Sequence, residues 1–142
     1  MTQITLQQSH DMIKAAFEKA VQLALKPLSV AVVDAGGHLI AFARQDGAST
    51  LRPQIASAKA CGALGLGVSS RKIADMAAER PAFMTSLSVL SSQGIIPAAG
   101  GIIIIDGYGG AIGAIGVTGD TSDNDELCAL AAITNVKLNA QI

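Results

Sequence analysis

Residues 94–120, GIIPAAGGIIIIDGYGGAIGAIGVTGD, decide the fold of this chain. This stretch holds more than half of the fifteen glycines and an unbroken run of four isoleucines at 102–105. A short apolar run that ends at an aspartate and a glycine is typical of a strand buried on both faces. Residues 111–118 form its predicted antiparallel partner, and residues 106–110 form the hairpin loop between them.

The glycines of this stretch fall in two places. Gly113 and Gly116 lie inside the second strand, where glycine marks a bulge or the close approach of another backbone. For these two we expect close packing against a helix. Gly100 and Gly101 precede the first strand, and two interpretations stay open for them: packing, or backbone amides that face a ligand.

A second hairpin is predicted nearer the N-terminus. Residues 28–34 and 38–45 read as apolar strands joined by a glycine turn. Capping residues, prolines and helical periodicity predict helices over five segments: 5–25, 53–65, 71–79, 82–90 and 124–136. Thr5 with Gln8, and Asp123 with Glu126, match the capping-box pattern. Because hairpins imply antiparallel pairing, we expect an α/β (α+β) domain spanning 1–142 and no βαβ units.

Composition restricts the class of function. Half of the 142 residues are hydrophobic, 15% are charged, and the net charge is −1. Aromatic residues make up 3% and tryptophan is absent, which counts against stacking platforms and a basic groove for nucleic acid. So little polar surface favours a homo-oligomer that buries further apolar area.

The two cysteines, Cys61 and Cys128, match neither a metal-ligand spacing nor a disulfide framework. The first ten residues lack the features of a signal peptide, and no apolar run approaches the length of a membrane span. These observations lead us to expect a cytoplasmic protein without a membrane partner.

Several active-site classes have no support in the sequence. The glycine turns join strand to strand and lack the helix N-terminus that a phosphate-binding loop needs. No GxSxG nucleophile motif, HExxH motif or carboxylate cage is present. His38 follows a turn and is expected to be solvated. His10 is predicted on the apolar stripe of the first helix, either as a packing or interface residue or as an iron ligand.

Charged residues give a different set of candidates. Arg44 and Asp46 end a strand on one face, either as a surface ion pair or as a rim that reads a carboxylate. Lys59 lies among small residues on a helix, where it is either solvated or a base with a shifted pKa. Glu79 and Arg80 end a helix, and Arg80 either bonds the last carbonyl groups or reaches toward the glycine pair.

Five phrases together resemble the GlcG/HbpS haem-binding family, which also includes the C-terminal domain of PduO-type proteins. They are PLSVAVVDAGGHLIAFARQDGA (27–48), ASAKA (56–60), AAERPAFMTSL (77–87), GIIPAAGGIIIIDGYGGAIGAIGVTG (94–119), and the Asp-rich entry to the last helix with Cys128. The resemblance spans about residues 6–133. This chain departs from the family pattern at Ile102–Ile104, where the family commonly has a proline after the glycine pair.

The resemblance implies a profilin-like three-layer α/β/α fold in which an antiparallel sheet of about five strands is flanked by helices. It also implies homo-oligomers, including octamers, and haem binding linked to redox sensing or to cobalamin, diol or small-acid metabolism. A histidine of the first helix binds haem in parts of the family, and His10 is the matching position here.

Three hypotheses follow. The first is a cytoplasmic oligomer that binds haem or a related tetrapyrrole, with His10 on the iron. The second is an isomerase or hydrolase for a small unsaturated acid, with Arg44 and Arg80 on carboxylates, Lys59 as base and the Gly100–Gly101 amides as oxyanion site. The third is an accessory subunit without pocket chemistry. The candidate ligand-binding residues are His10, Asp34, Asp46, Glu79, Gly100 and Gly101.

Overall fold

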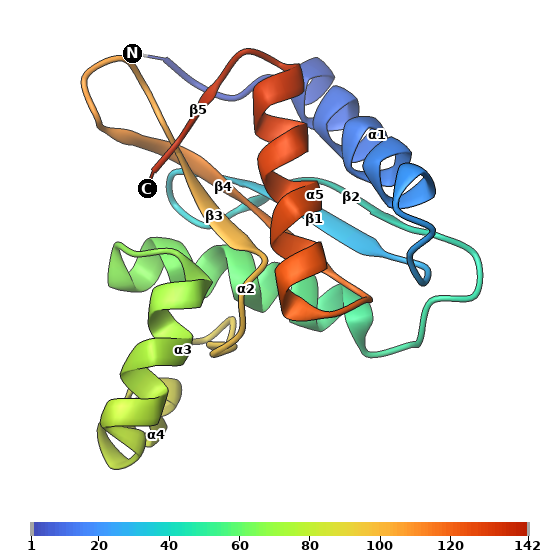
Figure 1. Cartoon of the computed structure of the whole chain (residues 1–142). Coiled ribbons are helices and arrows are strands. Elements are labelled where there is room, and N and C mark those ends of the chain that lie inside the picture. The colour runs from blue at the N-terminus through green and yellow to red at the C-terminus, as the bar shows by residue number, and fades with distance from the viewer. Residues whose placement is uncertain (1, 142) are drawn as a thin grey trace.

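The computed structural model describes residues 2–141, which form five helices and one five-stranded sheet. The elements follow in the order α1 (Leu6–Gln22), β1 (Ser29–Asp34), β2 (Leu39–Arg44), α2 (Arg52–Leu66), α3 (Ser70–Glu79), α4 (Pro81–Leu90), β3 (Gly101–Ile105), β4 (Ala111–Thr118), α5 (Ser122–Asn135) and β5 (Asn139–Ala140). The expected antiparallel α/β fold is therefore confirmed (Figure 1).

The two predicted hairpins lie side by side in the sheet, whose strand order is β2-β1-β4-β3-β5. They join through β1 and β4, where Val32 pairs with Ile115. The short edge strand β5 pairs with the end of β3. The sequence gives no sign of β5, because two residues are too few to show an alternating pattern.

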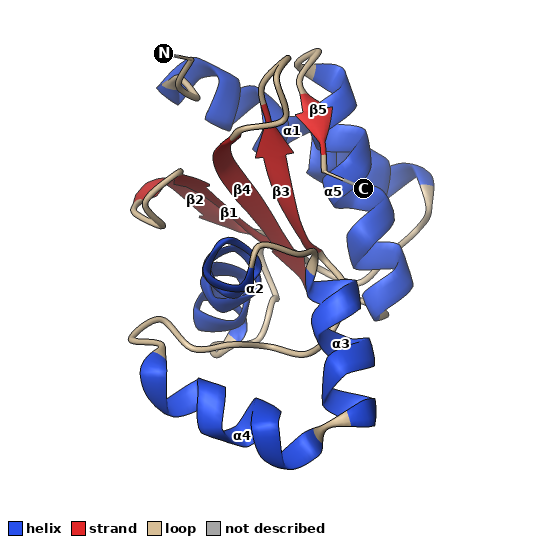
Figure 2. Ribbon diagram, turned by 90° about the vertical axis from the view of Figure 1, so that its left-hand side faces the viewer, coloured by secondary structure: helices blue, strands red, loops and turns tan. Residues whose placement is uncertain are grey.

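Helices cover both faces of the sheet (Figure 2). Helices α1 and α5 lie on one face and enclose the larger core, to which β1, β3 and β4 contribute Val30, Ile104 and Ile115. Helix α2 covers the other face, where Ala60 packs against Val33 and Ala114. Helices α3 and α4 continue outward from α2, and only Met84 of α4 is buried.

The interior glycines of β4 permit this close contact. A side chain at Gly116 would collide with the carbonyl oxygen of Ala56 on α2, and one at Gly113 would collide with the carbonyl of Val33. Helix and sheet can approach this closely only where no Cβ intervenes. The expected packing against a helix is confirmed for Gly116, whereas Gly113 packs against the neighbouring strand β1 and the side chain of Ile4.

Two helix ends differ from expectation. The capping box of Thr5 and Gln8 is confirmed. Helix α1 ends at Gln22, earlier than the expected end at residue 25. The cap of α5 is Thr121, whose hydroxyl accepts from the amide of Asn124, so the prediction of a capping box at Asp123 was wrong. Asp123 instead pairs with Arg71 of α3.

None of the helices in residues 2–141 combines the length and the apolar character needed to cross a membrane.

Candidate functional site

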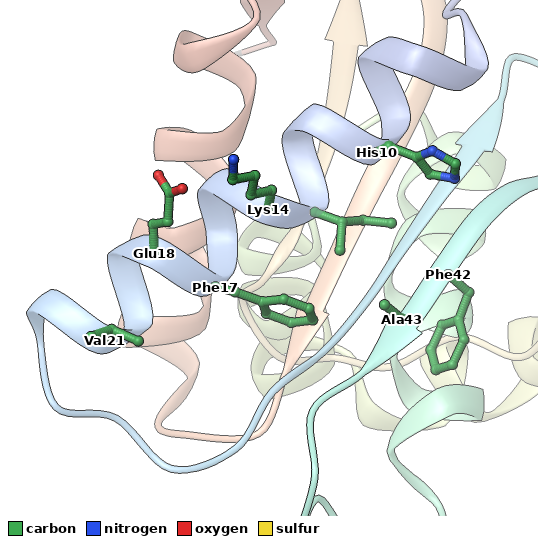
Figure 3. A pocket seen from close by; sticks show the side chains of 8 residues that line it. His10, Lys14, Phe17, Glu18, Val21, Phe42 and Ala43 are labelled. Atoms are coloured by element: carbon green, nitrogen blue, oxygen red, sulfur yellow. The ribbon is translucent and has the colours of Figure 1, made fainter.

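A groove of about 610 Å³ runs between α1 and the edge strand β2 (Figure 3). Its walls are mostly apolar, with His10 toward one end, Phe17 on the α1 side, and Phe42 and Ala43 on the β2 side. The residues that line it are His10, Ile13, Lys14, Phe17, Glu18, Val21, Phe42 and Ala43. An apolar groove with a few polar groups is the usual form of a small-molecule site.

His10 is exposed, so the prediction that it lies away from the solvated face of α1 was wrong. The residues of α1 that turn inward are Ser9, Met12, Ile13, Ala15, Ala16 and Ala20. His10 follows Ser9 by one position and therefore lies at the edge of this buried face, beside the groove. No hydrogen bond to its ring is found within residues 2–141. An accessible imidazole without a protein partner can coordinate a metal centre.

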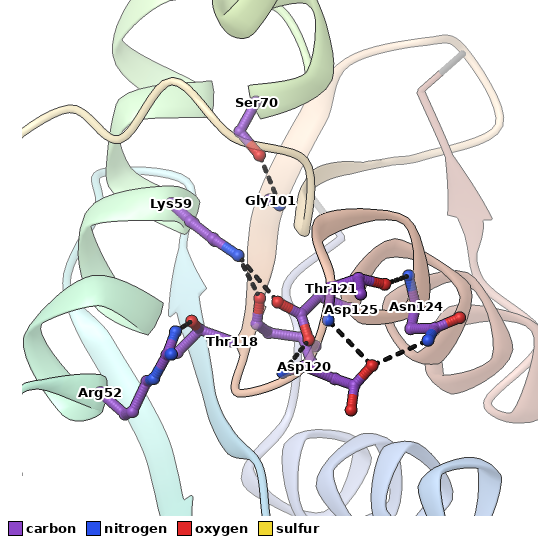
Figure 4. A network of polar contacts seen from close by, with 10 residues as sticks. Arg52, Lys59, Ser70, Gly101, Thr118, Asp120, Thr121, Asn124 and Asp125 are labelled. Carbon is purple, nitrogen blue, oxygen red and sulfur yellow. Dashed lines mark hydrogen bonds and ion pairs between the residues drawn. The ribbon is translucent and has the colours of Figure 1, made fainter. Parts of the chain in front are cut away.

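Lys59 projects from α2 into a closed polar cluster (Figure 4). Its Nζ atom donates to the Val117 carbonyl at 2.9 Å and to Asp125 Oδ2 at 3.2 Å. Only 3% of the Lys59 side chain is exposed. Burial lowers the pKa of Lys59 and raises the pKa of Asp125, while the attraction between them opposes each shift. The amine is therefore both engaged and closed off from solvent.

Gly100 and Gly101 lie directly against this cluster. Gly100 has a φ of 128°, and a Cβ there would come within 2.9 Å of Lys59 Nζ. The amide of Gly101 donates to Ser70 Oγ at 2.7 Å, in a buried contact. Because that N–H is already bonded, it is not available to an oxyanion in this arrangement.

The structure thus brings Lys59, Gly100 and Gly101 together, but Arg44 and Arg80 make no hydrogen bond or ion pair with them in the described part of the chain. Arg80 packs its guanidinium 4.0 Å from the centroid of the Phe83 ring. Among the residues described, no contact from Arg80 to the glycine pair is found.

The carboxylates suggested by the sequence lie apart. Asp46 shares a surface hollow with Arg44, but no ion pair forms between them within residues 2–141. Glu79 is exposed at the end of α3. Asp34 stabilises the first hairpin turn through the amides of Gly36 and His38, and these bonds lower its pKa. The solvated position expected for His38 is confirmed.

Neither cysteine thiol is activated as a nucleophile or as a metal ligand. Cys61 Sγ donates to the Gly37 carbonyl at 3.3 Å, and burial raises its pKa. Burial also raises the pKa of Cys128 to about 11. A thiol with a raised pKa is a poor nucleophile and a poor metal ligand at neutral pH. Among residues 2–141, no group of three histidine, cysteine or carboxylate side chains could hold a metal ion.

Two important residues were missed from the sequence. Phe42 lines the β2 side of the groove, and the only sequence signal for it was a phenylalanine within the predicted strand 38–45. Asp125 lies in the first turn of α5, where acidic residues are usually exposed, but it faces inward and is buried, and nothing in the sequence separates it from its exposed neighbour Asp123.

Solved structures share this fold. ORFY of Klebsiella pneumoniae is 30% identical, with a TM-score of 0.85 over 96% of this chain and 92% of its own. A double mutant of HbpS from Streptomyces reticuli is 30% identical, with a TM-score of 0.81 over 94% and 87%. A structure described as a PduOC–haem complex is 23% identical, with a TM-score of 0.87 over 99% and 100%, and this likeness shows the fold.

No curated protein gives a match to the sequence. The family described as haem-degrading protein HbpS-like matches residues 4–134, which is most of the chain. This match agrees with the 30% identity to HbpS over nearly the whole length. The chain therefore belongs to the HbpS-like family of haem-degrading proteins.

Proposed function

We propose that this protein binds haem in the groove between α1 and β2, with His10 as the axial ligand of the iron. The observation that carries the proposal is the exposed imidazole of His10 at the end of an apolar groove, in a chain of a haem-protein family. The other histidine, His38, is bonded to Asp34 in a hairpin turn and lies outside this groove.

The groove residues fit a flat, mostly apolar ligand that carries acidic groups. Ile13, Phe17 and Phe42 offer apolar surface to its face. Lys14, one turn from His10, offers an ammonium group to a carboxylate of the ligand. Haem, when bound, would supply a redox-active iron, and the protein would supply the axial imidazole and the apolar surroundings.

Assembly into a homo-oligomer, for instance an octamer, belongs to the same proposal. Large apolar side chains remain at the surface, including Val21 beside the groove and Val89 and Leu90 on α4, which are 75%, 85% and 82% exposed. Burying these side chains in an interface between copies of the chain would remove apolar surface from water and stabilise an oligomer. The uncrosslinked thiols Cys61 and Cys128 support a reducing, cytoplasmic location. A role in redox sensing, or beside cobalamin, diol or small-acid metabolism, would use the bound haem.

Titration of the purified protein with hemin tests the proposal. We expect a saturable Soret shift in the parent protein and in a His38→Ala control, and loss of that shift in His10→Ala. Circular dichroism checks that all three proteins remain folded. A Soret shift that is unchanged in His10→Ala would contradict the assignment of His10 as the iron ligand.

A further inference from the structure

A row of polar side chains crosses three strands at the end of the sheet farthest from the hairpin turns. Ser29 at the start of β1 pairs with Arg44 of β2 on one side and with Thr118 of β4 on the other. Directly opposed residues of antiparallel strands project from the same face. Arg44, Ser29 and Thr118 therefore stand in line on one face of the sheet.

Helix α2 adds a second arginine to this row. The Nη1 atom of Arg52 donates to Thr118 Oγ1 at 2.7 Å, so the α2 side of the sheet is the face on which the row stands (Figure 4). Arg44 and Arg52 thus lie on either side of Ser29. No carboxylate lies within ion-pair distance of either guanidinium in residues 2–141. Three cations, Arg44, Arg52 and Lys59, lie in this region with two carboxylates. Asp125 pairs with Lys59, and Asp46 shares a surface hollow with Arg44, so one positive charge remains in excess.

Ser29 supplies an independent sign of a missing ligand. It is completely buried, and its Oγ atom is the single buried side-chain nitrogen or oxygen in residues 2–141 without a hydrogen-bond partner. Buried hydroxyl groups are nearly always bonded, and an unbonded one costs stability. This hydroxyl projects from the strand position that Arg44 and Arg52 flank.

The start of α2 favours negative charge at the same place. Arg52 is the first residue of this fifteen-residue helix. Its amide donates to the Ser49 carbonyl and Pro53 has no N–H, so in the first turn the Gln54 amide alone is without a hydrogen-bond partner among the described residues. A helix N-terminus carries partial positive charge and attracts anions. Arg52 therefore lies between the N-terminus of α2 and the hydroxyl group of Thr118 on the sheet.

We infer that Arg44, Arg52, Ser29 and Thr118 form a binding site for a small oxyanion, either a phosphate or a carboxylate group. Two guanidinium groups match the paired oxygens of such an anion. An anion that enters between them accepts from the Ser29 hydroxyl, which no other group in the described chain satisfies. None of these four residues lines the groove that contains His10, so this site is separate from the haem site.

Isothermal titration with sodium phosphate and with sodium malonate, at constant ionic strength and pH 7, tests the inference. We expect saturable binding of at least one anion, and the tighter one identifies the chemical group that the site takes. Arg44→Gln and Arg52→Gln should each weaken it by at least about tenfold, because each removes a charge-assisted hydrogen bond. Arg71→Gln, which alters an exposed ion-pair network between α3 and α5, is the matched control and should bind like the parent.

Ser29→Ala separates a ligand role from a purely structural one. Without anion, its free energy of unfolding should equal or exceed that of the parent, because an unbonded buried hydroxyl is removed. With anion, its affinity should fall. Absence of saturable binding of either anion to the parent protein would overturn the inference, as would binding that Arg44→Gln, Arg52→Gln and Ser29→Ala leave unchanged.

Discussion

The ammonium group of Lys59 lies 3.2 Å from Oδ2 of Asp125, and both side chains are almost completely buried. This pair joins α2 to α5 across the end of β4, because Lys59 also donates to the carbonyl of Val117. Asp125 in turn accepts from the backbone amide of Asp120 at 3.0 Å. Lys59, which the sequence suggested as a catalytic base, therefore helps to hold together the helices α2 and α5, which lie on opposite faces of the sheet.

Breaking this pair from one side should be costly. Asp125→Leu leaves a buried ammonium group without a carboxylate, and we expect a loss of about 3–5 kcal/mol in the free energy of unfolding. The double variant Lys59→Met/Asp125→Leu should lose much less than the sum of the two single variants, because no uncompensated charge remains. Urea unfolding measures all four proteins, and strictly additive losses would show that the two groups do not interact.

Gly100 should tolerate no side chain. Its φ of 128° is unfavourable for other residues, and a methyl group would press on the Val117 carbonyl and on Lys59. We expect Gly100→Ala to lose at least about 1–3 kcal/mol of unfolding free energy. Gly65→Ala is the control, because a Cβ at that helical position meets no atom within 4 Å, and it should gain about 0.5–1 kcal/mol. Equal effects at the two positions would be evidence against the close contact at Gly100.

Asp120 should give the protein an acid-sensitive contribution to stability. Hydrogen bonds from the Asn124 side chain and from the amides of Lys26 and Thr121 lower its pKa from 3.8 to about 2. Because the folded-state pKa is the lower one, this contribution is present above pH 3.8 and is lost as the pH falls through about 2.

The comparison with Asp120→Asn measures this contribution. The difference in unfolding free energy between the two proteins should stay constant down to about pH 5 and shrink below it. A difference that grows on acidification would have the wrong sign for a depressed carboxyl pKa.

Phe42 should matter for haem affinity but not for the iron ligand. Phe42→Ala removes part of the apolar wall of the groove, so we expect weaker hemin binding with an unchanged Soret maximum. Phe83→Ala, which removes a half-exposed ring from α4 far along the chain from the groove, should bind hemin as the parent does. Identical hemin affinities for the parent and both variants would mean that Phe42 does not contact the ligand.

The fold could be predicted from the sequence because its local signals agree with one another. The apolar run at Ile102–Ile105 and the glycine turns specify both hairpins, and the Thr5–Gln8 capping box specifies the start of α1. Such signals depend only on neighbouring residues.

The site was less predictable because it depends on distant pairs. His10 was expected among apolar neighbours, but a shift of one position along α1 separates buried Ser9 from exposed His10. The partners of Lys59 and Arg52 lie 66 positions away in each case, at Asp125 and Thr118. Spacing along the chain cannot reveal contacts that only the packing of α2 and α5 against the sheet creates.

A crystal structure of the protein with hemin, with anomalous data collected at the iron edge, tests the central claim most directly. We predict an iron peak next to the His10 imidazole, with the macrocycle lying in the groove between Phe17 and Phe42. An iron peak next to His38 or Cys61, with the α1–β2 groove empty, would contradict the account.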